Sequence, residues 1–577
     1  MNRLMSGLRD GAIPGAGNLG RRSALKALAA LGIGTTTFQR ALAAQAEKAP
    51  AITAEMVKQA EWIAGLELTD AERAAVAKSM ERTVKELEDL RKQPVGYDLP
   101  PALTFFPTPP RPAATVERGR LPRLDPSGVK RPTSDEDLAF LSIGELGALI
   151  RSRQTTSVEL TRLYLGRLKR FDPMLKCVVT LTETLALEQA ERADRELRSG
   201  RDRGPLHGIP WGAKDLIAYP GYPTTWGATP FKGRVLDHKA TVAERLDQAG
   251  AVLIAKLSLG ALASGDQWFG GRTRSPWDPR RGSSGSSAGS ASAAAAGLVG
   301  FAIGSETLGS IVSPCRACGA TGLRPTFGRV SRAGCMTLSW SMDKLGPIAR
   351  SVMDCAYVFD AIHGADDQDA AALDQPFPWP AARALETLKV GYIEEPRRPS
   401  ATRPELKLLR QLGFNLVPIT LPTQIPVWAV TIMLSVEAAA AFDELTRKHI
   451  SDGLNEWPET FRMGQFVPAV EYLRAARIRT SLMRAMARRF DEVDLYVGSG
   501  LDLPITNLTG HPSVVMPLGF ADRDGRPAPG SVVLTGRLYD ETTILAVAQA
   551  LENAARDNLE RPPLEAFLAQ ENAPKTS

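Results

Sequence analysis

The spacing of apolar residues predicts helices near the start of the chain. Between positions 76 and 90 an apolar residue recurs at every third or fourth position, namely Val76, Met80, Val84, Leu87 and Leu90. This spacing places all of them on one face of an α-helix. Thr69 and Glu72 stand just before the run with the spacing of a capping box, in which each side chain binds the other residue's backbone N–H. Residues 52–92 are therefore expected to be helical.

Further along the chain, helical patterns alternate with short apolar runs. Residues 158–171 and 185–197 have helical spacing, whereas 177–181 and 252–257 are short and mostly apolar, as buried strands are. This alternation predicts an α/β fold around a central sheet. The small-residue segment 291–297 predicts a helix that packs closely on that sheet.

Three polar segments in the same region can together form a hydrolytic centre. They are LHGIPWGAKD at 206–215, GSSGSSAGS at 282–290 and GSETLGS at 304–310. A serine hydroxyl is a weak nucleophile until a base takes its proton. Lysine can be that base when burial lowers its pKa, and a glycine-rich turn can direct backbone N–H groups at an oxyanion. The combination predicts acyl transfer from an amide, because the leaving amine must be protonated as the C–N bond breaks.

Each segment contributes a residue with a predicted role. Ser310 is the nucleophile, Lys214 is the base, and Ser286 is the hydroxyl that passes the proton between them. The oxyanion is expected to bind the backbone N–H groups of one turn, made of Thr307, Leu308, Gly309 and Ser310. Ser287 and Ser305 are expected to support these groups from behind. The chemistry calls for no cofactor and no metal.

These segments resemble the amidase signature family. Five blocks match in the family's order, at 206–215, 275–291, 304–331, 342–356 and 510–543. The resemblance implies an amidase-signature-like α/β/α sandwich around a mixed central β-sheet, preceded here by an N-terminal helical extension. It implies a Ser–cis-Ser–Lys triad of Ser310, Ser286 and Lys214. It further implies a serine amidohydrolase that cleaves a non-peptide carboxamide through an acyl-enzyme on Ser310.

Four positions depart from the residues usual in that family. They are Ala261, Ala288, Leu308 and Val312. None belongs to the triad, but Leu308 brings a bulky side chain next to the nucleophile. Together with the tryptophans and methionines of 376–490, Leu308 indicates an apolar or aryl acyl group, while the physiological substrate stays open.

The formal net charge of +6 is concentrated at the N-terminus. Residues 1–43 contain six basic residues and one acidic residue, which leaves about +1 for the rest, so no nucleic-acid partner is expected. The pair Arg21-Arg22 precedes a mildly apolar run at 27–38 and a small-residue cleavage site at 41–43. This order is typical of a bacterial twin-arginine signal peptide and predicts export to the periplasm or the medium.

The sequence predicts four successive parts. They are a twin-arginine-type signal peptide at 1–43, a helical extension at 44–93, a proline-rich connector at 94–134 and an amidase signature domain at 135–565. No apolar stretch is long enough for a stable membrane anchor. The expected partner is a small-molecule amide substrate, and a homodimer stays open.

Several alternatives remain at this point. Ser287 lies in a Gly-x-Ser-x-Gly pattern at 285–289, which with His511 can form the nucleophile elbow of an α/β-hydrolase, although 275–285 is a poor strand for it. Residues 52–72 loosely resemble the small helical subunit that wraps the amidase subunit of a tRNA-dependent amidotransferase. The chain can therefore be the glutamine-amidase subunit of an amidotransferase, although an export signal argues against this. An esterase, a carbamate hydrolase or a non-catalytic binding protein can use the same scaffold.

Overall fold

The computed structural model describes residues 52–94, 103, 121–379, 381, 383–395, 398–500, 502–555 and 560–571. The expected signal peptide at 1–43 and most of the proline-rich connector at 94–134 lie outside the described residues. The chain divides into two compact units, Met1–Lys85 and Glu86–Ser577, and each is described by itself.

The described part of the first unit is helical, as predicted. It contains α3 (Ala54–Ala64) and the start of α4 (Asp70–Lys92), which continues into the second unit. Thr69 N donates to Glu72 Oε2 at 2.8 Å and Glu72 N donates to Thr69 Oγ1 at 3.3 Å, which confirms the capping box. Arg73 of α4 forms an ion pair with Glu61 of α3 at 2.7 Å and joins the two helices.

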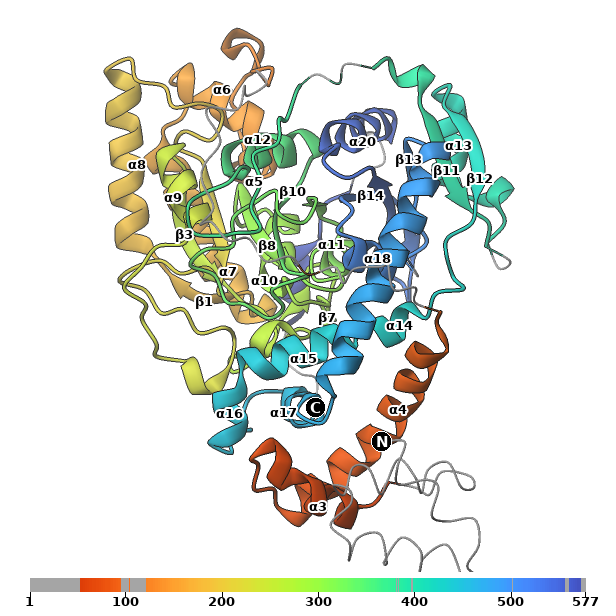
Figure 1. Ribbon diagram of the computed structural model, residues 1–577. Coiled ribbons are helices and arrows are strands. Elements are labelled where there is room, and N and C mark those ends of the chain that lie inside the picture. Colours follow the sequence, from red (N-terminus) through yellow and green to blue (C-terminus); the bar gives the residue numbers. More distant parts are fainter. Residues whose placement is uncertain are drawn as a thin grey trace, which may run out of the picture. The chain divides into compact units, whose positions relative to one another are not determined.

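Eleven of the described strands form one mixed sheet in the second unit (Figure 1). Across the sheet the order is β1 (Val178–Leu181), β3 (Val252–Leu257), β2 (Pro210–Lys214), β8 (Phe301–Glu306), β10 (Lys344–Ala349), β9 (Thr321–Arg324), β14 (Ser513–Asp522), β15 (Pro527–Gly536), β13 (Leu495–Val497), β11 (Lys389–Ile393) and β12 (Asn415–Ile419). β3, β2 and β8 run parallel to one another, as do β13, β11 and β12, and the remaining neighbours are antiparallel.

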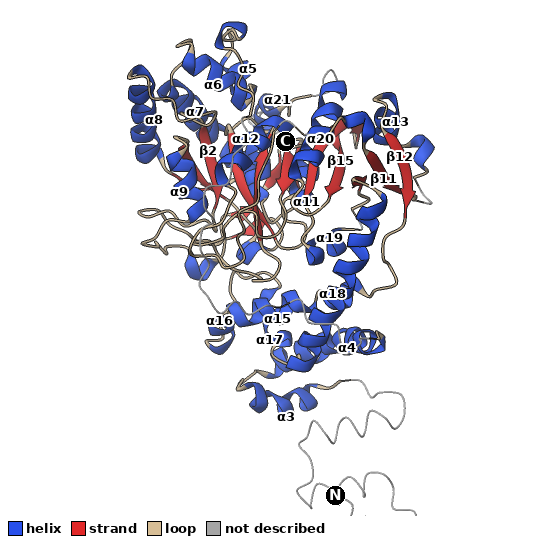
Figure 2. Ribbon diagram, turned by 45° about the horizontal axis from the view of Figure 1, so that its top comes forward, coloured by secondary structure: helices blue, strands red, loops and turns tan. Residues whose placement is uncertain are grey.

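Helices pack on both faces of this sheet, which gives the expected α/β/α sandwich (Figure 2). The α-helices of this unit are α5 (Asp135–Phe140), α6 (Ile143–Arg151), α7 (Ser157–Leu175), α8 (Glu183–Arg198), α9 (Thr241–Gln248), α10 (Ala288–Ala295), α11 (Val312–Cys318), α12 (Val352–Ile362), α13 (Pro404–Gln411), α14 (Val427–Val430), α15 (Ile432–Ala441), α16 (Asp443–Arg447), α17 (Trp457–Gly464), α18 (Ala469–Glu492), α19 (Leu503–Thr509), α20 (Glu541–Ala555) and α21 (Leu564–Glu571). None of the described helices is long and apolar enough to cross a membrane.

The small residues of α10 let this helix lie directly against the sheet. All eight of its residues are buried. A Cβ atom at Gly289 would lie 2.4 Å from Cys177 O and 2.5 Å from Ser258 N, so only glycine allows this approach. The helix runs a few residues earlier than the predicted 291–297 and ends before Gly297, whose φ of +63° is left-handed.

The segment before the paired serines differs from the prediction. We expected 275–285 to be a poor strand, but β6 (Arg274–Ser275) and β7 (Asp278–Gly282) form a hairpin outside the central sheet. Trp277 anchors its turn, because its Nε1 donates to Cys318 O at 2.7 Å. This anchor comes from tertiary contact, so the local sequence pattern did not reveal it. A second hairpin joins β4 (Gln267–Trp268) and β5 (Gly271–Arg272).

Candidate active site

Two adjacent parallel strands bring the first site residues together. β2 ends at Lys214 and β8 ends at Glu306, with Ala213 opposite Ile303. The carboxyl ends of parallel neighbours lie at one edge of a sheet, and ligands of α/β proteins bind at this edge. Lys214 therefore meets the segment 304–310, and α10 begins beside them.

Lys214 contacts serines from both glycine- and serine-rich segments. Its Nζ atom lies 2.8 Å from Ser286 Oγ, 3.1 Å from Ser287 Oγ and 2.8 Å from Ser305 Oγ. The lysine is completely buried, and the Gly285–Ser286 peptide bond is cis. The residues predicted to support the site from behind, Ser287 and Ser305, are therefore direct neighbours of the predicted base.

The hydrogen bonds around Ser287 determine the direction of its contact with the lysine. Ser287 Oγ donates to Ser305 O at 3.0 Å and accepts from Ser305 N at 3.1 Å. A hydroxyl has a single hydrogen, so Lys214 must be the donor to Ser287. A neutral amine has two hydrogens and one lone pair. If one hydrogen is donated to Ser287 and the other to Ser305, whose Oγ and O atoms lie 2.8 and 3.3 Å away, the lone pair is left for Ser286. The geometry suits an uncharged lysine that accepts a proton from Ser286.

Burial favours this uncharged form. It lowers the pKa of the Lys214 ammonium to about 7, although the nearby carboxylates of Asp343 and Glu306 act in the opposite direction. The hydrogen-bond partners of its Nζ atom in the described part of the chain are all neutral oxygens. An amine with this pKa can act as a general base near neutral pH.

Ser310 lies in the turn between β8 and α11. Its backbone oxygen accepts from Ser287 N at 3.0 Å, which ties the turn to the start of α10. Gly309 has a φ of +94°, a left-handed conformation that favours glycine. Ser310 is 9% exposed and Ser286 is 1% exposed, so Ser310 is the serine that a substrate reaches more easily. The described side-chain hydrogen bond of Ser286 runs to Lys214 and not to Ser310.

Glu306 anchors this turn from inside the protein. Its Oε2 accepts from Ile311 N and Val312 N at 2.8 and 3.0 Å, and its Oε1 accepts from Arg324 at 2.8 Å. Burial raises the pKa of this carboxyl, but the charges of Arg324 and Lys344 and the hydrogen bonds from Arg324 and Val312 together outweigh burial, and the pKa falls to about 2. The ionised carboxylate therefore binds the backbone on the far side of Ser310.

A second carboxylate, that of Asp343, binds Thr307 at the start of the same turn. Thr307 Oγ1 donates to Asp343 Oδ1 at 2.6 Å, and Asp343 Oδ2 accepts from Leu338 N and Ser339 N at 2.8 and 2.9 Å. With Glu306 at one end and Asp343 at the other, the turn that offers the predicted oxyanion N–H groups is fixed on two sides.

Leu308 packs against an apolar cluster that includes Met342 and Met433. Of the tryptophans and methionines of 376–490 that indicated an apolar acyl group, Met433 and Met486 belong to this cluster. Trp457 is buried in the main core and Trp428 is 64% exposed, so neither belongs to this cluster.

The geometry does not support the alternative nucleophile elbow. His511 Nδ1 lies 2.7 Å from Thr509 Oγ1, and its ring stacks on Phe490 with the centroids 4.8 Å apart. Burial lowers the pKa of His511 to about 3. This imidazole is part of the core, whereas the hydroxyl of Ser287 faces Lys214.

Within the described ranges, no group of three or more His, Cys, Asp and Glu side chains is arranged to hold a metal. Cys315 and Cys318 of α11 have the spacing of a metal or redox motif, but both are buried free thiols. Burial raises the pKa of both thiols, so they pack as small apolar groups next to the nucleophile turn.

The sequence model of the Amidase family matches residues 159–499, more than half of the chain. The chain belongs to this family. Membership confirms the resemblance to amidase signature enzymes that the sequence segments indicated, and with it the enzyme class of the amidases.

Among curated relatives, the chain is similar to a glutamyl-tRNA(Gln) amidotransferase subunit of Chloroflexus aurantiacus. The two are 34% identical over 488 residues, which covers 74% of this chain and 99% of the relative. Among solved structures, it is similar to the peptide amidase of Stenotrophomonas maltophilia, with 30% identity, a TM-score of 0.63, and 73% of this chain and 98% of that chain covered. A bacterial aryl acylamidase of the amidase signature family shares the fold at 23% identity, with a TM-score of 0.63 over 72% of this chain and 96% of that chain.

Sequence reasoning missed the role of Glu306 in this amidase. The residue stands in the segment GSETLGS and is the last residue of β8, which is buried along its whole length. A carboxylate at such a position was the only signal available, because a buried acid needs a partner. The partners come from remote segments, Arg324 in β9 and Asn507 in α19.

The activity of this amidase is expected to rise with pH to a plateau, with a midpoint at about pH 7. Lys214 has a pKa of about 7 and can accept a proton only in its neutral form, which predominates above that pH. The measurement is kcat/KM for one amide from about pH 5 to about pH 9. A profile that is flat or falls across this range would contradict a lysine base.

Proposed function

We propose that this amidase hydrolyses a non-peptide carboxamide through an acyl-enzyme on Ser310, with Lys214 as base and Ser286 as proton relay. The observation that carries the proposal is the buried Lys214, whose Nζ atom lies 2.8 Å from Ser286 Oγ and has only neutral oxygen partners among the described residues. Among the described residues no carboxylate is hydrogen-bonded to this amine, and burial outweighs the more distant charges of Asp343 and Glu306, which favours the neutral form that a base needs.

The reaction begins when neutral Lys214 takes the proton of Ser286, which in turn takes the proton of Ser310. Ser310 Oγ attacks the carbonyl carbon, and the N–H groups of the turn 307–310 bind the oxyanion. As the C–N bond breaks, Ser286 returns a proton to the leaving amine and is reprotonated by Lys214. Water then attacks the acyl-enzyme by the same relay and releases the carboxylic acid.

The direct relay requires Ser286 and Ser310 to come into hydrogen-bond contact when substrate binds. Catalytic hydrogen bonds are often long or absent in free enzymes and form in the substrate complex. The backbone hydrogen bond from Ser287 N to Ser310 O already holds the two serine segments together, and the contact between the hydroxyls is proposed to form by rotation of the two side chains.

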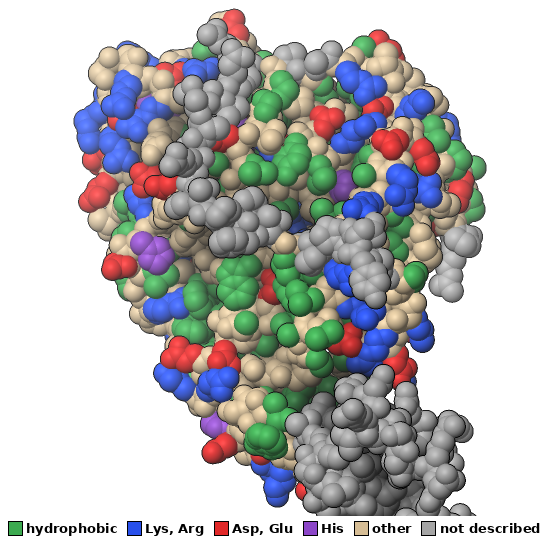
Figure 3. Space-filling view, viewed as in Figure 1, with side chains coloured by type: hydrophobic (Ala, Val, Ile, Leu, Met, Phe, Trp, Pro, Cys, Tyr) green, Lys and Arg blue, Asp and Glu red, His purple; other side chains and the backbone are tan. Residues whose placement is uncertain are grey.

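Leu308 supports an apolar or aryl acyl group as part of this proposal. Leu308 belongs to the same turn as Ser310, and its side chain packs against the apolar cluster that includes Met342 and Met433. The substrate is proposed to be a small molecule and not nucleic acid. On the face in Figure 3, Lys and Arg side chains are interspersed with Asp and Glu and form no continuous basic surface.

A serine-directed phosphonate is expected to label Ser310 stoichiometrically and to abolish amide hydrolysis. Mass spectrometry of the labelled peptide locates the adduct, and a Ser310→Ala variant is the control. A panel of aryl, fatty and small polar amides then tests the acyl group, with the matching esters beside them. No adduct at Ser310 would favour a non-catalytic binding protein, and fast cleavage of small polar amides alone would refute the apolar acyl site.

A second candidate is a glutamine-amidase subunit of an amidotransferase. The similarity to the glutamyl-tRNA(Gln) amidotransferase subunit of Chloroflexus aurantiacus over 74% of this chain favours it. Glutamine as the best substrate of the panel, together with a partner protein that copurifies from the cytosol, would replace the first proposal. Preferential cleavage of the esters or carbamates would keep the acyl-enzyme and change the substrate class.

The protein is proposed to be exported by the twin-arginine route, as the order of features in 1–43 suggests. Replacing Arg21 and Arg22 by lysines is expected to retain the protein in the cytoplasm. Cell fractionation of the unaltered chain and the variant, expressed in a bacterium with a twin-arginine translocase, measures this. Equal distribution of the two proteins would contradict the proposal.

A further inference from the structure

A cavity of about 730 Å³ lies beside the catalytic segments and is lined by arginines. Six arginines line it, namely Arg272, Arg280, Arg281, Arg316, Arg523 and Arg526. They come from three separate parts of the chain, the hairpins formed by β4 to β7, helix α11, and the connection between β14 and β15. Its volume is in the range of small-molecule sites.

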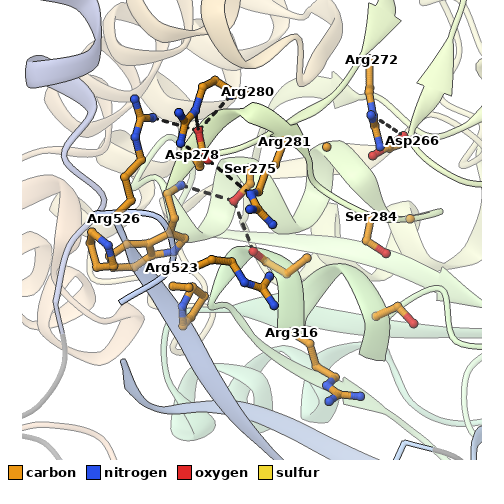
Figure 4. A pocket seen from close by; sticks show the side chains of 18 of the residues that line it. Asp266, Arg272, Ser275, Asp278, Arg280, Arg281, Ser284, Arg316, Arg523 and Arg526 are labelled. Carbon is orange, nitrogen blue, oxygen red and sulfur yellow. Dashed lines mark hydrogen bonds and ion pairs between the residues drawn. The ribbon is translucent and has the colours of Figure 1, made fainter. Parts of the chain in front are cut away.

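The carboxylates of the cavity neutralise only part of this charge. Arg280 and Arg526 both bind Asp278 at 2.9 Å, and Arg272 binds Asp266 at 3.0 Å. Figure 4 shows the first group around Asp278 and the Arg272–Asp266 pair on the other side of the view.

Three positive charges remain in excess. Arg281 forms ion pairs with Asp524 at 2.7 Å and with Asp278 at 3.4 Å, so the six guanidinium groups share three carboxylates, Asp266, Asp278 and Asp524. Arg316 binds only the neutral hydroxyl of Ser531, at 3.2 Å, and Arg523 has no side-chain partner among the described residues. These two guanidinium groups keep donors available for a ligand.

The remaining lining of the cavity is rigid and partly apolar. Trp277, Pro527 and Pro529 contribute to it, and Trp277 is 3% exposed and bonded to Cys318 O. Proline and a buried indole lose little freedom when a ligand binds. A concave site with fixed walls distinguishes this arrangement from arginines scattered on a convex surface.

We propose that this cavity is a second binding site, for a small, multiply charged oxyanion of the phosphate or carboxylate class. Guanidinium groups bind phosphate and carboxylate oxygens through paired, charge-assisted hydrogen bonds. The unneutralised Arg316 and Arg523 are the main contacts, and the Asp278 group orients the others. The site is separate from the triad, because neither Lys214, Ser286 nor Ser310 lines it.

Calorimetric titration of the full chain tests the proposal, with inorganic pyrophosphate in one arm and citrate in the other. At least one of the two is expected to bind saturably with one site per chain. The double variant Arg316→Gln/Arg523→Gln is expected to lose about tenfold or more in affinity, because it removes strong charge-assisted contacts. Pyrophosphate binding alone would assign a phosphate ligand, and citrate binding alone a carboxylate ligand.

The matched control is Arg484→Gln/Arg488→Gln, which removes the same charge from two exposed arginines of α18. Its affinity is expected to stay within about twofold of the unaltered protein, because screened surface charges contribute little. Exposed arginine substitutions leave folding intact in most proteins, and the single variant Arg316→Gln provides a milder test. The proposal fails if neither probe binds saturably, or if both double variants lose affinity equally.

Discussion

Replacing Lys214 by methionine is expected to lower kcat/KM by about 10⁴-fold or more, because removing one member of a catalytic unit costs nearly as much as removing all of it. Methionine has a similar length and no basic group, so it fills the buried space and leaves Ser286 without a proton acceptor. The amine of Lys214 is hydrogen-bonded to neutral oxygens and to no carboxylate among the described residues, so no direct ion pair is broken and the fold is expected to persist. Steady-state kinetics and thermal unfolding measure the two effects.

Lys256 provides the contrasting variant. It is also completely buried, but it forms an ion pair with Asp215 at 2.7 Å. Lys256→Met leaves the buried Asp215 carboxylate with hydrogen bonds from Thr225 but without its counter-charge, which lowers the free energy of unfolding by about 3–5 kcal/mol. The two variants should therefore have different effects: Lys214→Met lowers kcat/KM, whereas Lys256→Met lowers the free energy of unfolding. If Lys214→Met kept activity within about tenfold of the unaltered enzyme, Lys214 could not be the base.

Replacing Glu306 by glutamine is expected to lower the free energy of unfolding by about 3–5 kcal/mol, because it leaves the buried Arg324 guanidinium without its counter-charge. The amide also cannot accept from both backbone N–H groups and from Arg324 at once. Activity is expected to fall as well, because the turn carrying Ser310 loses its anchor. Chemical denaturation at neutral pH gives the stability change.

A double-mutant cycle provides the control for this second prediction. Arg324→Gln should cost a similar amount, and Glu306→Gln/Arg324→Gln should cost less than the sum of the two single variants. The pH dependence has a definite sign. The pKa of Glu306 is lowered from its usual value of 4.5 to about 2, so its stabilisation is complete above about 4.5 and is lost as the pH falls toward 2. Additive single-variant effects would show that the ion pair is energetically unimportant.

Elements with strong local signals were predicted closely. β3 occupies the predicted 252–257, and α7 (Ser157–Leu175) contains the predicted 158–171. A mostly apolar run specifies β3, and a capping box at Thr156 and Glu159 specifies the start of α7, without help from distant residues. The hairpin of β6 and β7 was not predicted, because the burial of Trp277 against Cys318 stabilises it and no local pattern reveals that contact.

The candidate active site was also predicted only in part, because some of its contacts depend on tertiary structure. The order of segments indicated that Lys214 and Ser286, 72 positions apart, belong to one centre, and the structure brings them into contact. The order of the segments did not indicate that Ser287 and Ser305 both contact Lys214, or that Glu306 anchors the turn that carries Ser310. Those facts depend on which strands are neighbours in the sheet.

The sequence alone determined the fold class, the order of the elements and the residues able to carry out acyl transfer, because apolar spacing and reactive side chains are properties of local sequence. Only the tertiary structure decided that Lys214 is desolvated to a pKa of about 7, that ionised Glu306 holds the turn of Ser310, and that six arginines share one cavity. The physical reason is that desolvation and electrostatic fields depend on neighbours far apart in the chain, which come together only in the folded protein.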